Sequence, residues 1–323
     1  MRKICISTSI LFFICTIITS AAPAEEADKL QGSLGVGVMF INSGNNLNPS
    51  GSKRYLDDLN SAADKEASII PLVLPNVTYD VGDKGGLKLY LDTRPPVDEV
   101  GSFVFKIGGN YPLEAIGILD VNIFFTPFEE AWENPYAVGV RRKTTSTSKY
   151  GTQVALNKIM GTELRVNFVF LKDDVDEDVI GTLVPELGRD GEVYALNANY
   201  SFHPTESLEL RPRLGVRKGS YDGDSNSFIK YKIDLEARYS TGKLILMPRI
   251  SYSRSEYDEI NPIFNKTREG DDYGLGLMAI YSAPFGWEDW ALQGLFNYSI
   301  GDSNITFYET EGISTGIFMS YRF

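Results

Sequence analysis

Charged side chains that recur at every second position have the clearest capacity for chemistry in this sequence. The basic set is Arg165, Arg211, Arg213, Arg217, Lys230, Lys232, Arg238 and Arg249, and the acidic set is Asp80, Asp92, Asp120, Glu163, Glu209, Asp234 and Glu236. A period of two places side chains on one face of extended strands. A basic wall that faces a more acidic one across water would create a transverse field, which sorts ions and small polar solutes.

The same charges allow a second interpretation. Opposite charges on neighbouring strands can pair with one another, and a network of such pairs would fill a narrow barrel that carries nothing. The sequence leaves both interpretations open. Lys88 and Lys106 lie among the early acidic positions and are available for such pairing.

The residue types of the sequence give little support for a catalytic site. His203 is the single histidine of the chain and stands beside Pro204 in an expected short turn, away from any serine or aspartate in the middle of a strand. Histidine is the commonest general base and a frequent metal ligand. We therefore predict a protein that is not an enzyme, with no catalytic residue, no metal site and no cofactor.

The elements that position these charges are strands with one apolar face. The last strand shows the pattern most clearly, since Ile313, Thr315, Ile317, Met319, Tyr321 and Phe323 alternate with mostly small or polar residues. A strand that ends the chain on an aromatic residue looks like the assembly signal of bacterial outer-membrane barrels. Tyr321 and Phe323 are thus expected to engage the barrel-assembly machinery.

Fourteen such strands can be counted, and short connections alternate with long ones. This asymmetry is typical of transmembrane antiparallel up-and-down β-barrels, with short periplasmic turns and long extracellular loops. The region 126–148 is the least regular and is expected to be a long loop with part of a strand at its end, so twelve or sixteen strands are possible. The segments 172–191 and 256–271 are expected to be loops. Pro212 and Pro248 fall inside strands, where a local bulge could accommodate them.

The amino terminus predicts export. Met1-Arg2-Lys3 precedes a short apolar run, and Ala22-Pro23-Ala24 fits the cleavage pattern of a secretory signal peptide. We expect cleavage after Ala24, with residues 1–24 as the signal and 25–323 as the barrel. Both cysteines, Cys5 and Cys15, lie in the signal, so the mature chain is predicted to hold no disulfide.

The charge balance argues against nucleic acid as a partner. Loss of Arg2 and Lys3 from 31 basic residues leaves 29 against 43 acidic residues, a net charge of −14. Nucleic-acid phosphates require basic surfaces. The expected partners are instead outer-membrane lipid and lipopolysaccharide, in the bacterial cell outer membrane.

Several local motifs resemble a known family. They are Asn134-Pro-Tyr-Ala-Val-Gly-Val140, Leu187-Gly-Arg-Asp-Gly191, Asn261-Pro-Ile-Phe-Asn-Lys-Thr267, Asp271-Asp-Tyr-Gly274, Pro284-Phe-Gly-Trp-Glu-Asp-Trp290 and Asp302-Ser-Asn-Ile-Thr-Phe-Tyr308. Together they resemble domain-of-unknown-function family 2860, a group of exported proteobacterial proteins. The resemblance implies an outer-membrane barrel and no activity, so it supplies no catalytic residues.

The sequence thus predicts a passive, porin-like channel for small polar or anionic solutes. The alternative is a non-transporting structural or surface-interaction barrel that acts through its long loops at 42–67 and 172–191. A loop such as 126–150 that folds inward as a plug would favour this alternative. The identity of the solute does not follow from the residues.

Overall fold

The computed structural model describes residues 29–82, 86–94, 103–127 and 129–323. The signal peptide predicted at residues 1–24 lies outside the described residues. In the described part of the chain, no helix is both long and apolar enough to cross a membrane.

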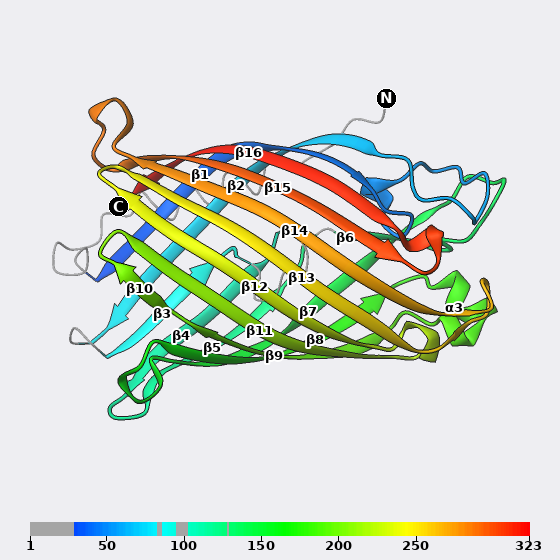
Figure 1. The fold of residues 1–323 in the computed structure, drawn as a ribbon, viewed down its shortest axis with the longest axis horizontal. Coiled ribbons are helices and arrows are strands. Elements are labelled where there is room, and N and C mark those ends of the chain that lie inside the picture. Colours follow the sequence, from blue (N-terminus) through cyan, green and yellow to red (C-terminus); the bar gives the residue numbers. More distant parts are fainter. Residues whose placement is uncertain (1–28, 83–85, 95–102, 128) are drawn as a thin grey trace.

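Strands make up nearly all of the regular structure (Figure 1). In chain order they are β1 (Leu30–Gly44), β2 (Glu66–Val81), β3 (Leu87–Asp92), β4 (Phe105–Leu113), β5 (Gly117–Phe125), β6 (Glu129–Trp132), β7 (Thr144–Asn157), β8 (Leu164–Val175), β9 (Gly191–Tyr200), β10 (Phe202–Thr205), β11 (Leu208–Tyr221), β12 (Phe228–Thr241), β13 (Leu244–Asn261), β14 (Lys266–Ser282), β15 (Trp290–Ser303) and β16 (Thr310–Arg322). One short helix, α3 (Val179–Leu183), and the 3-10 turns η1 (Pro49–Gly51), η3 (Ile159–Gly161), η4 (Pro185–Leu187), η5 (Asp224–Asn226), η6 (Pro284–Gly286) and η7 (Thr306–Tyr308) lie in the described connections.

These segments form a closed antiparallel barrel of fourteen strands, which confirms the predicted fold class. β6 pairs with β7 beyond the end of β5, and β10 pairs with β11 beyond the end of β9. Each of these two segments therefore continues its predecessor along the wall. The ring closes where β1 pairs with β16 from Ser33–Arg322 to Gly44–Glu311. The backbone of Gly32 also exchanges two hydrogen bonds with that of Phe323.

The outer face of the barrel is apolar and exposed. Apolar side chains point away from the interior, and five of them are 52–62% exposed: Val36, Ile123, Leu214, Ile233 and Ile317. Aromatic side chains occupy both ends of this surface, with Tyr252 against Tyr273 at one end and Trp290 against Tyr321 at the other. Rings at the two borders of an apolar band are the pattern of a membrane-spanning barrel.

Three predicted loops were partly wrong. Residues 256–271 are mostly strand, because β13 and β14 extend to a tight turn at residues 262–265. β13 is roughly 60 Å long at about 3.3 Å per residue, far more than an apolar band about 25 Å tall. The outer face of its last part is therefore polar, where Arg254 contacts Glu256, Glu269 and Asp271, and the alternation of apolar residues ends before the strand does.

The other two corrections have the same cause. β8 continues to Val175, inside the predicted loop at 172–191. In the region 126–148, the start of β7 is the strand expected at its end, whereas β6 lies in the part expected to be a loop. His203 belongs to β10 rather than to a turn. Pro212 and Pro248 pair in regular register with Leu235 and Leu277, so neither proline requires a bulge in those pairings.

A hydrophobic core lies among the long connections at one end of the barrel (Figure 1, right). Its buried members are Leu56, Tyr136, Ile180, Leu187, Ile305, Phe307 and Tyr308. We call this packed group of connections the loop cap. The connections β8–β9 and β15–β16 both contribute to it, although they leave the ring on nearly opposite sides. Loops that meet from opposite sides must cross the mouth, so the loop cap spans this end of the barrel.

Candidate functional site: the charged interior and the loop cap

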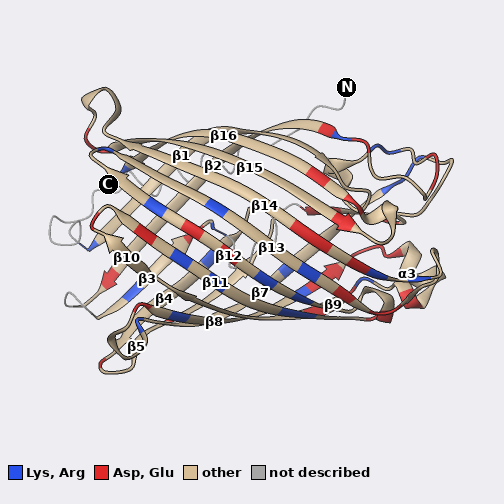
Figure 2. Ribbon diagram, in the orientation of Figure 1, with Lys and Arg blue, Asp and Glu red and all other residues tan. Residues whose placement is uncertain are grey.

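The register places the predicted basic set on the face opposite the exposed apolar side chains. Directly paired residues of antiparallel strands share a face. Arg165 and Arg213 both pair with Asn199, and Arg213 also pairs with Asp234. The same rule places the rest of the set inside the barrel: Arg211, Arg217, Lys230, Lys232, Arg238 and Arg249. Figure 2 shows these charges as adjacent coloured bands on β11, β12 and β13.

Ion pairs connect much of this basic wall to carboxylates on the same strands. Arg211 lies 2.7 Å from Glu209 and 3.0 Å from Glu236. Arg249 Nη2 donates to Asp234 Oδ1 at 2.7 Å, and Asp234 is only 3% exposed. Pairs across strands were one of the two interpretations of the sequence, and they form here.

Positive charge is still in excess on these three strands. Seven inward basic side chains, Arg211, Arg213, Arg217, Lys230, Lys232, Arg238 and Arg249, stand against three inward acidic ones, Glu209, Asp234 and Glu236. Lys230 extends this network to β14, because its Nζ lies 3.1 Å from Oδ2 of Asp272 on that strand. The local field on this side of the interior is therefore positive.

Three of the predicted acidic residues, Asp80, Asp92 and Asp120, lie across the ring on β2, β3 and β5. Asp80 pairs with Lys88 at 3.2 Å, and Asp92 lies 3.1 Å from Arg94 and 3.2 Å from Lys106. Asp120 accepts a hydrogen bond from Tyr90 at 2.6 Å. This wall is largely neutralised by its own cations, so it is less acidic than the carboxylates alone indicate.

A pocket of about 480 Å³ opens beside this wall at the end with the short turns. Its lining includes Lys88, Asp120 and Arg165, so residues of the basic and the acidic set meet there. Glu163 lies in the turn before β8 and is exposed, which places it at this mouth rather than along the wall. His203 is exposed at the same end, with Nε2 3.9 Å from Glu209 Oε1.

No group of three or more His, Cys, Asp or Glu side chains that could hold a metal ion occurs among the described residues. The acidic run after Lys172 has structural partners instead. Asp174 accepts from Tyr150 at 3.0 Å, and Asp178 pairs with Arg189 at 2.6 Å.

At the opposite end, Arg142 fastens two connections of the loop cap to each other. It is 2% exposed and donates to the backbone oxygens of Asn46 and Pro135 at 2.9 and 3.1 Å, and also to that of Lys53. Its guanidinium stacks 4.2 Å above the ring of buried Trp132. Burial lowers the pKa of Arg142 to about 10, and the carbonyl oxygens favour the charged form.

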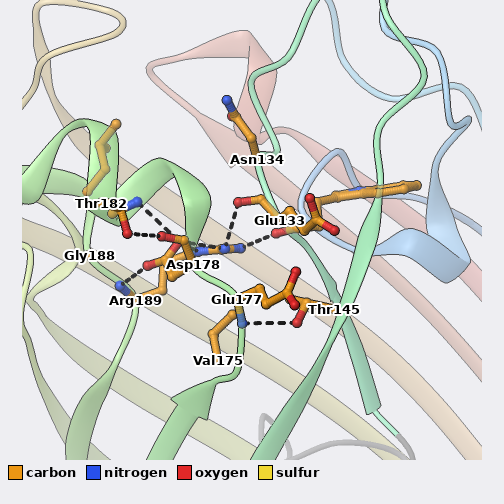
Figure 3. A network of polar contacts seen from close by, with 12 residues as sticks. Glu133, Asn134, Thr145, Val175, Glu177, Asp178, Thr182, Gly188 and Arg189 are labelled. Carbon is orange, nitrogen blue, oxygen red and sulfur yellow. Dashed lines mark hydrogen bonds and ion pairs between the residues drawn. The ribbon is translucent and has the colours of Figure 1, made fainter.

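Arg189 fastens the β8–β9 connection to the segment after β6 (Figure 3). It makes a forked contact with Asp178 and donates to the backbone oxygens of Trp132 and Glu133 at 2.7 and 3.3 Å. Asp178 also begins α3 by accepting from the backbone N–H of Gly181 at 3.2 Å. The two arginines thus hold three connections around Trp132.

Tyrosines complete the loop cap. The hydroxyls of Tyr136 and Tyr308 lie 2.6 Å apart, and Asn261 Nδ2 donates to Tyr308 at 2.7 Å. Arg268 stacks on the ring of Tyr308 at 3.9 Å. Burial raises the pKa of both hydroxyls, so they remain protonated and can continue this chain of hydrogen bonds.

The sequence did not reveal these loop-cap residues, because they have no periodicity. The one available signal was their occurrence within the family motifs, since Asn134–Val140, Leu187–Gly191, Asn261–Thr267 and Asp302–Tyr308 all contribute to the loop cap. The region 126–150 was expected as a possible plug. It contributes Tyr136 and Arg142 to the loop cap, while β6 and β7 remain in the wall.

The closed wall, the exposed apolar outer face and the polar interior define a β-barrel of the outer-membrane type. The family model described as "Protein of unknown function (DUF2860)" matches residues 30–322, and the chain belongs to this family. No curated protein matches the chain.

Solved structures with a similar fold are outer-membrane proteins of low sequence identity. An anion-selective porin from Comamonas acidovorans is 12% identical, with 91% of this chain and 98% of that chain covered and a TM-score of 0.41. The outer membrane channel DcaP of Acinetobacter baumannii is 11% identical, with coverages of 91% and 96% and a TM-score of 0.45. The outer membrane protein OprD from Pseudomonas aeruginosa is 10% identical, with coverages of 91% and 94% and a TM-score of 0.42.

Proposed function

We propose that this protein is a passive channel of the bacterial outer membrane that conducts small polar or anionic solutes. The observation that carries the proposal is the excess of positive charge on the inward faces of β11, β12 and β13. Fixed charges on the wall of a water-filled pore attract ions of the opposite sign. In this proposal the short turns face the periplasm, the loop cap faces outward, and the protein is not an enzyme.

Two further features support an interior that admits water. Asn297 and Ser299 point inward from β15 and are nevertheless exposed. Fourteen strands also enclose a wider space than the eight whose side chains fill a small barrel. Solute would pass between this interior and the pocket that contains Lys88, Asp120 and Arg165.

Planar bilayers that contain the mature protein test the proposal. We expect steady openings with a preference for anions, and loss or reversal of this preference in Arg211→Glu/Arg213→Glu. Lys218→Glu, which changes a charge on the outward-pointing side of β11, is the matched control and should leave the selectivity unchanged. Silent bilayers with folded, heat-modifiable protein would overturn the channel.

A second function is favoured by one observation, the loop cap that spans the mouth. In this alternative the barrel is a non-transporting scaffold, and its connections at 42–67 and 172–191 bind a partner at the cell surface. Removal of the loop cap separates the two functions. A channel gains conductance when the cap is loosened, whereas a scaffold stays silent.

A further inference from the structure

Part of the barrel interior is apolar, and this feature is separate from the charged walls. The stretches 30–44, 67–79, 273–282, 290–301 and 312–321 contain no charged residue. They belong to β1, β2, β14, β15 and β16, which are neighbours around the ring and appear as long uncharged bands in Figure 2. Both faces of the strands therefore lack charge along these stretches.

The register aligns apolar side chains across the inward face of these strands. Met247 pairs with Met278, Met278 with Leu295, Leu295 with Gly316, Gly316 with Met39, and Met39 with Ile70. Arg249 has the same parity on β13 as Met247, so this row lies on the inner face. We call these residues, together with Phe318, the apolar inner wall.

Part of the apolar inner wall remains accessible from the interior. Phe318 lies flat on two glycines, since a Cβ at Gly37 would come within 2.5 Å of its ring and a Cβ at Gly316 within 2.7 Å. Ile70, Met247, Met278 and Leu295 are only partly buried. The interior of a water-filled barrel is ordinarily polar, so an apolar surface there is a candidate site for a ligand that would cover it.

Methionine is unusually frequent on this surface. Met39, Met247 and Met278 are three of the six methionines of the chain. The flexible and polarizable thioether suits surfaces that accept ligands of varied shape. The apolar inner wall therefore fits an aliphatic or aromatic group of variable size.

Positive charge borders this surface directly. Arg249 is two residues from Met247 on the same face. On β12 and β13, Glu236 pairs with Arg249 and Tyr239 pairs with Leu246, without a shift in register. The same register places Arg238 opposite Met247. One ligand could thus contact the apolar row with its body and the guanidinium groups with an anionic head.

We infer that the barrel binds amphipathic anions, with a hydrophobic body on the apolar inner wall and a carboxylate, sulfonate or phosphate head near Arg238 and Arg249. This inference rests on the proposed channel and narrows its solutes from small polar or anionic molecules to anions with an apolar body. Desolvation of that body provides affinity, which grows with each CH₂ group that is buried.

Alkanesulfonates are suitable probes because their charge is fixed and their chain length can be varied. In planar bilayers, we expect octanesulfonate to interrupt the current of single channels with dwell times at least tenfold longer than those of ethanesulfonate. The triple variant Met247→Ser/Met278→Ser/Leu295→Ser should remove this dependence on chain length and still conduct. Asn197→Ser, an inward polar change on β9, should retain it.

A second readout does not depend on conductance. The fluorescent anion 1-anilinonaphthalene-8-sulfonate is added to the protein in nanodiscs, with empty nanodiscs as the reference. We expect octanesulfonate to displace it at concentrations at least tenfold below those of ethanesulfonate, and to lose this advantage in the triple variant. Folded protein is verified by heat modifiability in each case.

The outcomes separate the two proposals. Channels that conduct but respond equally to both sulfonates in both assays would overturn the amphipathic ligand and leave the channel intact. Silent bilayers would overturn the channel, and displacement in nanodiscs that depends on chain length would then support the binding site by itself.

Discussion

Arg142 and Arg249 carry the same guanidinium group in two regions of the molecule, and their surroundings differ. Arg142 lies in the loop cap among backbone oxygens and the ring of Trp132. Arg249 lies on the inner wall beside the carboxylate of Asp234. The guanidinium of Arg142 joins two segments of the chain, because it donates hydrogen bonds to backbone oxygens of both. Those oxygens carry no net charge, so they do not neutralise it.

On the inner wall, inward basic side chains outnumber the inward carboxylates, and in the proposed channel this excess would act on solutes in the interior. The arginines of the loop cap therefore hold its connections together, whereas in the proposed channel those of the wall would set the electric field of the interior. Substitutions in the loop cap should change access of solutes to the interior and cleavage of the loops by protease. Substitutions on the inner wall should change ion selectivity and the cooperative stability of the barrel.

The largest effect is expected for Arg142→Met. The change leaves the backbone oxygens of Asn46, Pro135 and Lys53 without this donor, at a cost of about 3 kcal/mol to the local stability of the loop cap. Cleavage of the loops by proteinase K should become roughly 100-fold faster, since that energy changes the population of the open form by this factor. Channel openings should also increase.

The matched control is Arg141→Met, because the neighbouring Arg141 side chain is exposed. Its loops should resist the protease as the unchanged protein does. Equal cleavage rates for the two variants would mean that Arg142 does not hold the connections together.

A smaller effect is expected for Arg249→Met. It removes the 2.7 Å partner of buried Asp234 and should lower the free energy of unfolding by about 2 kcal/mol, less than for a fully buried pair because Lys232 remains 4.0 Å away. The midpoint of urea unfolding in lipid vesicles measures this loss. The double variant Asp234→Asn/Arg249→Met should recover part of it.

Arg254→Met provides the comparison on the outer surface, where Arg254 is 41% exposed among its carboxylates. Water and salt screen exposed pairs, so its midpoint should hardly move. A larger loss for Arg254→Met than for Arg249→Met would contradict the distinction between exposed and inner charges.

Tyr308→Phe should have a modest effect on the loop cap. It removes the hydroxyl that contacts Tyr136 and accepts from Asn261, at a cost of about 1–2 kcal/mol. Cleavage by proteinase K should accelerate roughly tenfold, while the urea midpoint of the barrel stays unchanged. Tyr55→Phe is the control, because Tyr55 is 60% exposed, and acceleration of similar size there would refute the role of the buried hydroxyl.

The smallest effect is expected for pH, because the stability of the loop cap should change only under alkaline conditions. Burial raises the pKa of Tyr136 and Tyr308 above the ordinary value of 10.0, so the folded loop cap retains protons that the unfolded chain releases. The stabilisation is complete below about pH 10 and declines as the pH rises further. Near-ultraviolet circular dichroism between pH 9 and 12 should show this decline, and Tyr136→Phe/Tyr308→Phe should flatten it.

The arrangement of the wall could be predicted from alternation alone. The apolar positions from Leu34 to Phe323 identify the outer face, and fixing that face also places residues such as Arg213 and Asp234 on the inner one. The strand count of fourteen followed from the same pattern, because lipid requires an apolar residue at every second position. Beyond the lipid that requirement ends, which is why the outer parts of β13 and β14 were mistaken for a loop.

The tertiary structure decided which side chains are neighbours. A period of two assigns a residue to a face, but the register between strands far apart in the chain determines that Arg249 meets Asp234, and that Met247, Met278, Leu295 and Met39 form one row. The loop cap depended on the tertiary structure entirely. Its core joins Leu56, Ile180 and Phe307 from distant connections, and such contacts form only once the closed ring has brought the ends of its strands to a common mouth.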